Sequence, residues 1–474
     1  MTDGTRHYIG GRWTESHGAD SVEVENPATE GVIASVRIGD AEDVDRAVGA
    51  ASDALPAWSA TTAEERAVLL EAIASAVEQR ADELASTLTQ ELGVPVSMAR
   101  PAQVGMALQI FRQHADIARE FVFEEKRDGY RLVREPAGVV AAVTPWNFPL
   151  FQIACKVAPA LTAGCTVVLK PSELTPLNAL LLADILEQAG VPAGVVNVVT
   201  GDGIRTGEAL VSHPDVAVVS FTGSTRAGTR VSQVAADTVK KVVLELGGKS
   251  ASLVFADADI EAAVQRTVAS AFQNSGQVCA ALTRLVVERS RLGEVLELAV
   301  AAGGRFVPGD PQDPATLLGP VASRTQLDRI RGLVETAGRE GARVVLGGTE
   351  PPSGLARGHY VRPTILADVH PDSTVAQEEV FGPVLGVIPF DDEKEAVRIA
   401  NNSKYGLSGA VWSGDQERAE RVARKIKTGM VVVNGAAGTM RVPFGGVKQS
   451  GHGREWGDAG VEEFLDAKSL VIQP

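Results

Sequence analysis

The chain has 474 residues, more than one hydrophobic core usually supports, so two or more domains are expected. Hydrophobic residues make up 45% and charged residues 22% of the sequence, which is typical of folded globular proteins and argues against disorder. Acidic residues outnumber basic ones by 60 to 45, and the net charge of -15 disfavours nucleic acid and anionic membranes as partners.

The first part of the chain has helical periodicity, and the next part alternates between strand-like and helix-like segments. Across residues 63–91 apolar positions recur every three to four residues, which predicts helices that pack against a sheet. From Gly138 short β-branched runs alternate with helical stretches, which predicts a parallel sheet covered by helices, in a doubly wound nucleotide-binding layout. The predicted strands are 139–143, 166–169, 195–199, 216–220 and 242–244, and the predicted crossover helices are 176–188 and 203–210.

A second run of alternation follows Gly248, with candidate elements at 251–255, 260–274, 285–288, 384–389 and 430–434. Two outlying segments, 130–135 and 468–472, have strand patterns without an obvious partner in their own domain, and such edges often pair across subunits. We therefore expect an α/β protein with a Rossmann-like parallel-sheet cofactor domain, a second α/β catalytic domain and a small β oligomerisation element. These are predicted at 1–117 with 137–247, at 248–449, and at 118–136 with 450–474.

The positions of the cysteines and histidines argue against disulfide bonds and against a metal site. Cys155, Cys165 and Cys279 have no CxxC spacing, so neither a disulfide framework nor a thiolate metal site is predicted. The seven histidines form no HxH or HExxH arrangement, and we expect no metal. The N-terminus has no basic segment followed by an apolar stretch, and the longest apolar run, 157–169, is too short to span a bilayer. A cytoplasmic protein is expected.

Several standard motifs are absent. The stretch GDGIRTG at 201–207 is one residue too long for GxGxxG, and Gly248-Lys-Ser ends like a P-loop but has Val243 where the first glycine belongs. There is no GxSxG nucleophile elbow, so the sequence lacks the motif that usually indicates a serine hydrolase.

Three residues are candidates for chemistry, and each has a structural alternative. Cys279 lies in a segment of small residues, but most free cysteines are inert buried hydrophobes. Glu245 ends a predicted strand, where carboxylates of a parallel sheet face the ligand crevice, although it could be merely solvated. Asn147 stands between two prolines that fix its backbone, and it could be an oxyanion donor or a turn former.

Seven ordered motifs decide between these alternatives, because together they resemble the aldehyde dehydrogenase superfamily. The likeness extends from about Tyr8 to the C-terminus and includes a final segment, KQSGHGRE at 448–455. The seven motifs are TPWNFP at 144–149, KPSE at 170–173, FTGS at 221–224, ELGGK at 245–249, GQVC at 276–279, EEVFGP at 378–383 and PFGG at 443–446.

The resemblance implies a role for each candidate in the oxidation of an aldehyde to a carboxylate. Cys279 matches the nucleophile, which forms a thiohemiacetal and then a thioester. Asn147 matches a donor to the oxyanion, and Glu245 matches the base that activates water for hydrolysis. Lys156 and Glu455 match positions that support proton movement or pocket order, though each could equally belong to a structural ion pair.

The resemblance also implies a dinucleotide site. Glu173 can bond the ribose 2′-hydroxyl and would repel a 2′-phosphate, which favours NAD, with NADP possible. Ser224 opens a helix near the pyrophosphate. The implied cofactor residues are Trp146, Lys170, Ser172, Glu173, Gly203, Gly207, Phe221, Gly223, Ser224, Leu246, Glu379 and Phe381.

The implied substrate tunnel is largely apolar and has no fixed anion clamp, so a neutral, apolar or small aldehyde is favoured. Gly435 to Val442 departs from bulkier family patterns, which leaves the width of the pocket open. The implied lining residues are Phe148, Phe151, Gln152, Val278, Ala280, Met440 and Phe444. A homodimer or homotetramer is expected.

Three rival functions were weighed. A CoA-acylating semialdehyde dehydrogenase generally lacks the base found here as Glu245. A catalytically silent structural or binding member would be expected to have lost Cys279, Glu245 or Asn147, and all three are present. Esterase activity through the same thioester is more plausible as a side reaction. The physiological aldehyde does not follow from the sequence, because one fold serves many substrates.

Overall fold

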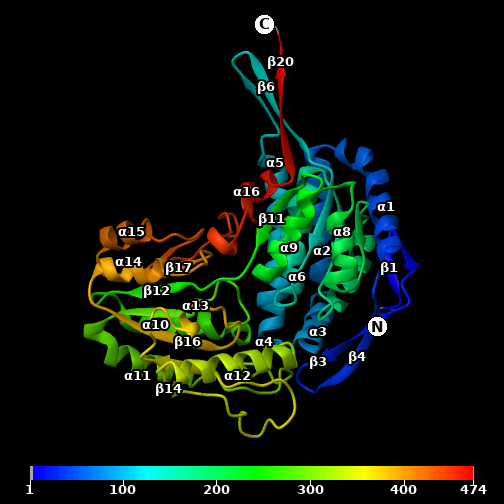
Figure 1. Cartoon of the computed structure of the whole chain (residues 1–474). Coiled ribbons are helices and arrows are strands. Elements are labelled where there is room, and N and C mark those ends of the chain that lie inside the picture. The colour runs from blue at the N-terminus through cyan, green and yellow to red at the C-terminus, as the bar shows by residue number, and fades with distance from the viewer. Residues whose placement is uncertain (1–3, 473–474) are drawn as a thin grey trace.

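The computed structural model describes residues 4–472 and is built around two large sheets with helices on both faces, as Figure 1 shows. The first sheet has eight strands in the order β19-β11-β10-β7-β8-β9-β1-β2. Its five central strands run parallel, as their β-branched and mostly buried sequences predict. They are β11 (Lys241–Glu245), β10 (Val216–Thr222), β7 (Val139–Val143), β8 (Thr166–Lys170) and β9 (Val196–Val198).

The edges of this sheet differ from a purely parallel arrangement. At one edge β1 (Arg6–Ile9) and β2 (Arg12–Glu15) form an antiparallel hairpin that pairs with β9. At the other edge β19 (Gly451–His452) returns from the end of the chain and pairs antiparallel with β11. This return brings the C-terminal segment beside Glu245, the last residue of β11.

Alternation of side chains along the central strands divides the packing into two layers. Val140 and Ala142 of β7 contact one layer, while Val139, Ala141 and Val143 contact the other. The first layer contains α2 (Ala63–Gln79), α3 (Ala81–Leu92), α5 (Gly105–Glu120), α6 (Pro149–Ala163) and α7 (Leu177–Gln188). The second contains α1 (Ala41–Ser59), α8 (Glu208–Ser212) and α9 (Thr225–Ala236).

The second sheet has seven strands in the order β14-β15-β16-β13-β12-β17-β18, and all but β14 run parallel. Its strands are β14 (Arg343–Leu346), β15 (Thr364–Ala367), β16 (Val384–Phe390), β13 (Arg284–Glu288), β12 (Ala251–Val254), β17 (Gly409–Trp412) and β18 (Val432–Val433). One face packs on α10 (Ile260–Phe272) and α11 (Leu292–Gly303). The other packs on α12 (Arg324–Arg339), α13 (Thr374–Gln377), α14 (Glu393–Asn401) and α15 (Gln416–Ala423).

A third, three-stranded sheet projects from the body of the molecule, at the top of Figure 1. It consists of β20 (Leu465–Val471), β6 (Tyr130–Pro136) and β5 (Glu124–Arg127), all antiparallel. The two outlying segments predicted as strands, 130–135 and 468–472, pair with each other within one chain, as β6 and β20. The pairing joins segments more than 300 residues apart, which local sequence patterns cannot reveal.

The other predicted elements lie close to their expected positions, with two informative differences. The helical pattern over 63–91 is divided at Arg80, where a new helix begins with Asp82 and Glu83 in its first turn. The helix predicted over 203–210 begins as a π-helical turn, η2 (Gly203–Gly207), and continues as α8. The short elements α4 (Val96–Met98), η1 (Ala99–Val104) and α16 (Gly457–Glu462) and the hairpin of β3 (Ser21–Asn26) with β4 (Gly31–Arg37) complete the fold. Across residues 4–472, no helix is both long and apolar enough to cross a membrane.

Candidate active site

Cys279 is presented by a loop whose backbone is held in an unusual conformation. After α10 ends at Phe272, three consecutive residues, Asn274, Ser275 and Gly276, have left-handed φ angles of 51°, 56° and 72°. A methyl group on Gly276 would lie 2.0 Å from the carbonyl carbon of Gly382, so only glycine fits there. The Ser275 hydroxyl donates to the Gly319 carbonyl at 2.9 Å. These contacts fix the approach to Cys279, which is half-buried.

Asn147 is tied to this loop from the other side of the cleft. It follows β7, and its backbone carbonyl accepts hydrogen bonds from the amide of Asn274 at 2.8 Å and of Gln103 at 3.1 Å. Its own side-chain amide donates to the Gln277 carbonyl at 2.9 Å, two residues before Cys279. The structure therefore brings Asn147 and the Cys279 loop together as the sequence predicted. Sequence reasoning missed Asn274, Gln277 and Gln103, although an asparagine before Ser-Gly signals a left-handed turn.

Glu245 is the last residue of β11 and is almost fully buried, with 2% of its surface exposed. Within residues 4–472, neither carboxylate oxygen has a hydrogen-bond partner. Burial, and secondly the nearby carboxylate of Glu455, raises the pKa of Glu245 well above its ordinary value. The glycines that follow it allow close approach, since a methyl on Gly248 would lie 2.3 Å from the carbonyl oxygen of Cys279. Glu245 is thus an unpaired buried acid beside the cysteine loop.

A buried ion pair lies next to Glu245. The Lys156 ammonium on α6 donates to Glu455 Oε1 at 2.6 Å, to the Thr222 hydroxyl at 2.8 Å and to the Ser220 hydroxyl at 3.2 Å. All three of its protons are thereby used. The second oxygen of Glu455 has no partner in the described part of the chain. Glu455 is held in place by paired backbone hydrogen bonds with Phe444.

The electrostatic surroundings of Cys279 favour its neutral thiol. Burial raises the pKa of Cys279, and the carboxylates of Glu245, Glu379 and Glu455 raise it further. A positive charge placed among these groups would have the opposite effect, because it would stabilise the thiolate. The site therefore suits a cationic ligand next to the cysteine.

A cavity of about 500 Å³ lies beside the first sheet, between η2 and α9. Val143, Val211, Val231 and Val234 give it apolar walls, and the predicted residues Glu173, Gly203, Gly207 and Phe221 also line it. The lining of this cavity does not include five other predicted cofactor residues: Lys170, Ser172, Gly223, Ser224 and Leu246. The Ser224 side chain caps α9, and the Lys170 ammonium holds the Pro171 and Gly201 carbonyls at 2.6 and 2.9 Å.

Glu379 reaches from the second sheet towards the first. Its carboxylate accepts a hydrogen bond from the Gly248 backbone at 2.9 Å, and burial raises its pKa to about 7. A methyl on Gly247 would lie 2.3 Å from Glu379 Oε2, so this approach requires glycine. Phe381, with a left-handed φ of 56°, places its ring edge-on to Trp146 at 5.3 Å between centroids. Trp146, Glu379 and Phe381 thus meet in the cleft between the sheets.

Aromatic rings line the other side of the cysteine loop. Phe444 stacks on Trp456 with 4.4 Å between centroids, and Phe151 packs against the same indole at 5.9 Å. The Trp456 N–H donates to Cys155 Sγ at 3.2 Å. Trp456 was not among the predicted residues, although it directly follows Glu455. Among the predicted pocket residues Gln152 also has a buried side-chain oxygen without a partner in residues 4–472, and Val278 and Ala280 flank Cys279 in the chain.

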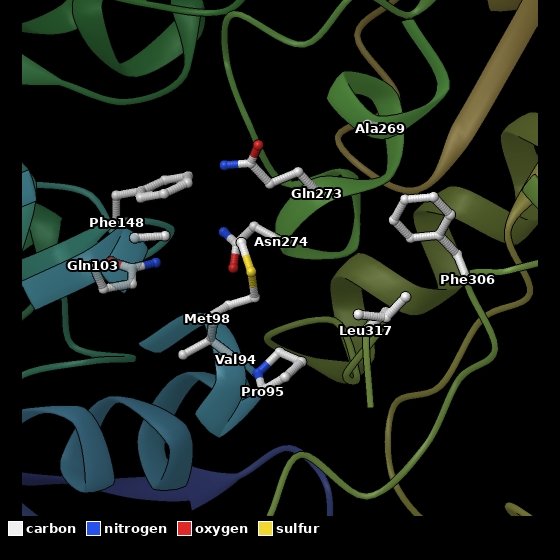
Figure 2. A pocket seen from close by; sticks show the side chains of 11 residues that line it. Val94, Pro95, Met98, Gln103, Phe148, Ala269, Gln273, Asn274, Phe306 and Leu317 are labelled. Atoms are coloured by element: carbon white, nitrogen blue, oxygen red, sulfur yellow. The ribbon is translucent and has the colours of Figure 1, made fainter. Parts of the chain in front are cut away.

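Figure 2 shows a smaller cavity, of about 140 Å³, whose lining includes Gln103 and Asn274, the two residues that donate to the Asn147 carbonyl. Phe148 and Asn274 line its inner end, and Phe306 and Leu317 lie on its far side. Phe148 is the only predicted substrate residue in its lining. The remaining walls are Val94, Pro95, Met98, Ala102, Gln103, Ala269 and Gln273.

Comparison with known proteins gives consistent results along the whole chain. The model described as "Aldehyde dehydrogenase family" matches residues 13–470. A 3-succinoylsemialdehyde-pyridine dehydrogenase of Pseudomonas sp is 49% identical over 472 residues, covering 99% of each chain. The crystal structure of a cysteine-to-alanine mutant of Pseudomonas syringae aldehyde dehydrogenase C, in complex with NAD+ and octanal, is similar with a TM-score of 0.98. It has 45% identity and covers 99% of this chain and 98% of its own. An aldehyde dehydrogenase from Bartonella henselae also has a TM-score of 0.98, with 42% identity and full coverage of both chains.

Proposed function

Because the chain belongs to the aldehyde dehydrogenase family, we propose that it oxidises an aldehyde to a carboxylate with NAD through a thioester on Cys279. The observation that carries the assignment of residues is that the amide of Asn147 and the carboxylate of Glu245, unpaired within residues 4–472, both lie beside the Cys279 loop.

Cys279 serves as the nucleophile in this proposal. Its thiol is neutral in the free enzyme, because burial and three carboxylates raise its pKa. The thiol proton must therefore leave as the sulfur attacks the aldehyde carbon. One of these three carboxylates, in its ionised form, can accept it. Attack forms a thiohemiacetal whose oxygen carries negative charge. Oxidation of that carbon leaves a thioester on Cys279.

Asn147 and the Cys279 backbone N–H stabilise the oxyanion. One proton of the Asn147 amide is already committed to the Gln277 carbonyl, which holds the amide in the cleft and leaves its second proton for the substrate. Because the Asn147 carbonyl is itself fixed by Asn274 and Gln103, this donor is preorganised. Removal of one such donor typically costs about 10²–10³ in turnover.

Glu245 serves as the base for hydrolysis of the thioester. Within residues 4–472 its two oxygens lack hydrogen-bond partners, so they are available to a water molecule, and its raised pKa makes the ionised carboxylate a stronger base than an ordinary glutamate. The Lys156–Glu455 pair tunes this base, since Glu455 raises the pKa of Glu245 while Lys156 lowers it. We assign Lys156 and Glu455 as positioning residues.

The residues present fit NAD. Bound NAD would supply the acceptor for the hydride that leaves the thiohemiacetal carbon. Glu173 and the other lining residues of the 500 Å³ cavity would hold the adenosine end, and the capped N-terminus of α9 suits the diphosphate. Lys170, Ser172, Gly223 and Leu246 would support these loops, and Glu379, Phe381 and Trp146 would hold the nicotinamide end. A cationic ring in this cleft would also lower the pKa of the Cys279 thiol.

The inner substrate site takes an apolar or neutral group next to the aldehyde carbon. Phe148, Phe151 and Phe444 supply apolar surface, and the similar protein from Pseudomonas syringae was crystallised with octanal. Gln152, Val278, Ala280 and Met440 are assigned to the same wall.

The domain division at about residue 247 and the role of the projecting sheet are part of the proposal. Within residues 4–472, strand β20 has one unpaired edge; it ends in the exposed residues Leu470 and Val471, and the exposed Ile472 follows it. An exposed apolar edge of this kind favours pairing with a second copy, so a homodimer or homotetramer is proposed.

The test is product stoichiometry. With aldehyde and NAD but without CoA, purified protein should form NADH and free carboxylic acid in a ratio of one to one. Product that forms only when CoA is added would contradict hydrolysis and favour acyl transfer. If none of the aldehydes tested leads to NADH formation, the proposed activity is wrong.

A further inference from the structure

A second cavity, of about 540 Å³, lies outside the catalytic centre against α10 and β17. Arg266 on α10 and Arg305, just after α11, both line it, together with the amide side chains of Gln265 and Gln273. No residue in its lining is acidic. The remaining lining residues are Ala269, Ser270, Leu282, Ala410, Trp412, Val432, Gly435 and Ala436.

The two arginines are available to a ligand. Within residues 4–472, the side chains of Arg266 and Arg305 make no hydrogen bond or ion pair, and both are exposed. By contrast, Arg112 and Arg119, which are also exposed or half-exposed, are paired with glutamates. In a chain of net charge -15, two unpaired guanidinium groups in one cavity form a local site for an anion.

This cavity adjoins the route to Cys279. It shares Ala269 and Gln273 with the 140 Å³ cavity that begins at Phe148 and Asn274, the residues around Asn147. In Figure 2 the Gln273 and Phe148 side chains extend towards each other across that inner cavity. It also shares Val432 and Ala436 with a groove of about 870 Å³ that ends at Trp456, next to Glu455.

The residues that these cavities share include small and flexible side chains. Ala269 and Ala436 present only a methyl group, and the Gln273 amide has no hydrogen-bond partner in the described part of the chain. A ligand can therefore extend from the aromatic inner site to the cationic cavity, since cavities of about 300–1,000 Å³ hold molecules of that size.

We propose that Arg266 and Arg305 bind a carboxylate at the far end of the aldehyde substrate, so that the enzyme takes an extended aldehyde with an apolar middle and an anionic terminus. This inference rests on the proposed function and refines it: the group next to the aldehyde carbon is apolar, and the charge lies beyond the Gln273 side chain. A guanidinium pair suits a carboxylate because its N–H groups match the two oxygens.

The test compares straight-chain aldehydes of increasing length that end in a carboxylate with their methyl esters. The protein is the full chain with NAD, and the variants are Arg266→Gln, Arg305→Gln and both together. An exposed charge pair contributes about 1 kcal/mol, which is about 5-fold in affinity. The double variant should therefore raise KM for the best carboxylate substrate about 10-fold or more and change kcat less than 2-fold. KM for the matching ester should stay within 2-fold.

Arg424→Gln is the matched control, because Arg424 is an exposed arginine at the C-cap of α15, without a side-chain partner in residues 4–472, and does not line the cavity. It should leave both KM values unchanged. Equal effects of the double variant on acid and ester, or an equal effect of Arg424→Gln, would overturn the proposal. Inhibition by succinate that is not competitive with the aldehyde would instead indicate a separate anion site. If the wild type oxidises no aldehyde, the proposed function fails, which is a different result.

Discussion

The two large sheets contribute to the site in different ways. The first sheet supplies titratable side chains at or near the carboxyl ends of parallel strands: Glu245 ends β11 and Lys170 ends β8. The domain of the second sheet supplies Cys279 from a loop after α10, and three consecutive left-handed residues hold this loop. In the first case the backbone is regular and the chemistry resides in the side chain. In the second, the conformation of the backbone decides where the reactive atom lies.

This difference predicts different consequences of mutation. A strand-end side chain can be replaced without disturbing the ladder, so its loss should affect one chemical step and leave folding intact. The loop depends on contacts such as that of Gly276 with Gly382, so small changes there should affect stability and position together. The following experiments would sharpen or break this comparison.

Replacement of Cys279 by alanine should have the largest effect. Loss of the nucleophile should lower NADH production by about 10⁴-fold or more, while NAD binding, measured by fluorescence titration, should change little. Cys165→Ala is the control, since Cys165 is buried in the core and its Sγ lies 3.2 Å from the Phe464 carbonyl. Substantial NADH production by Cys279→Ala would remove Cys279 from the mechanism.

Glu245→Gln should separate the two halves of the reaction. Rapid mixing should still give a burst of NADH of about one equivalent per site, followed by steady-state turnover reduced about 10²–10³-fold, because only hydrolysis loses its base. Mass spectrometry should find the acyl adduct on Cys279. If the variant binds NAD but shows neither burst nor adduct, Glu245 acts earlier, in deprotonating the thiol.

Gly276→Ala tests the loop itself. The new methyl meets the Gly382 backbone and must adopt a φ of 72°, so we expect a loss of about 2 kcal/mol or more in stability and at least about 10-fold in kcat/KM. Gly332→Ala on α12 is the control, because a methyl there meets no atom within 4 Å. It should leave activity unchanged and should not lower the melting temperature. Equal melting temperatures for the two variants would show that the loop is not held by its backbone contacts.

The pH dependence of hydrolysis should report on Glu245. The base must be ionised, and burial raises its pKa, so kcat should rise with pH up to that pKa and then level off. Glu455→Gln removes a carboxylate that raises the pKa of Glu245, so the inflection should move to lower pH. Lys156→Met removes a cation that lowers this pKa, so the inflection should move to higher pH. Shifts in the same direction for both variants would contradict the assignment.

Sequence reasoning predicted the parallel strands well because β-branched runs such as 139–143 carry their own signal. It also proposed Cys279, Glu245 and Asn147 as site residues, through motifs that share one resemblance, and the structure places the three near one another. It missed the pairing of β6 with β20, because that contact joins distant segments. The N-terminal hairpin was missed as well, although Gly10 and Gly11, with φ of 62° and 76°, are a local signal for a tight turn.

The sequence could not predict which polar groups of the site have hydrogen-bond partners and which do not. No pattern shows that the oxygens of Glu245 are unpaired, or that Asn274 and Gln103 hold the Asn147 carbonyl. Such facts depend on three-dimensional packing between residues that are far apart in sequence. The unpaired state of Arg266 and Arg305 belongs to the same class of information.

The smallest expected effect concerns Glu173, which lines the adenosine-side cavity from the loop after β8 and lies 3.9 Å from the Lys170 ammonium. A carboxylate at this position can accept a hydrogen bond from a ribose 2′-hydroxyl and repels a 2′-phosphate, so the wild type should prefer NAD over NADP in kcat/KM. Since the side chain is 39% exposed, water screens the repulsion and the carboxylate can turn away. Glu173→Gln should therefore narrow the preference by only about 3- to 10-fold, mainly through KM for NADP. Glu208→Gln offers a comparison, because Glu208 lines the same cavity but is already paired with Arg230. An equal change in both variants would mean that general charge in the cavity, rather than Glu173, sets the preference. Equal use of NAD and NADP by the wild type would show that the Glu173 side chain contributes nothing to cofactor choice.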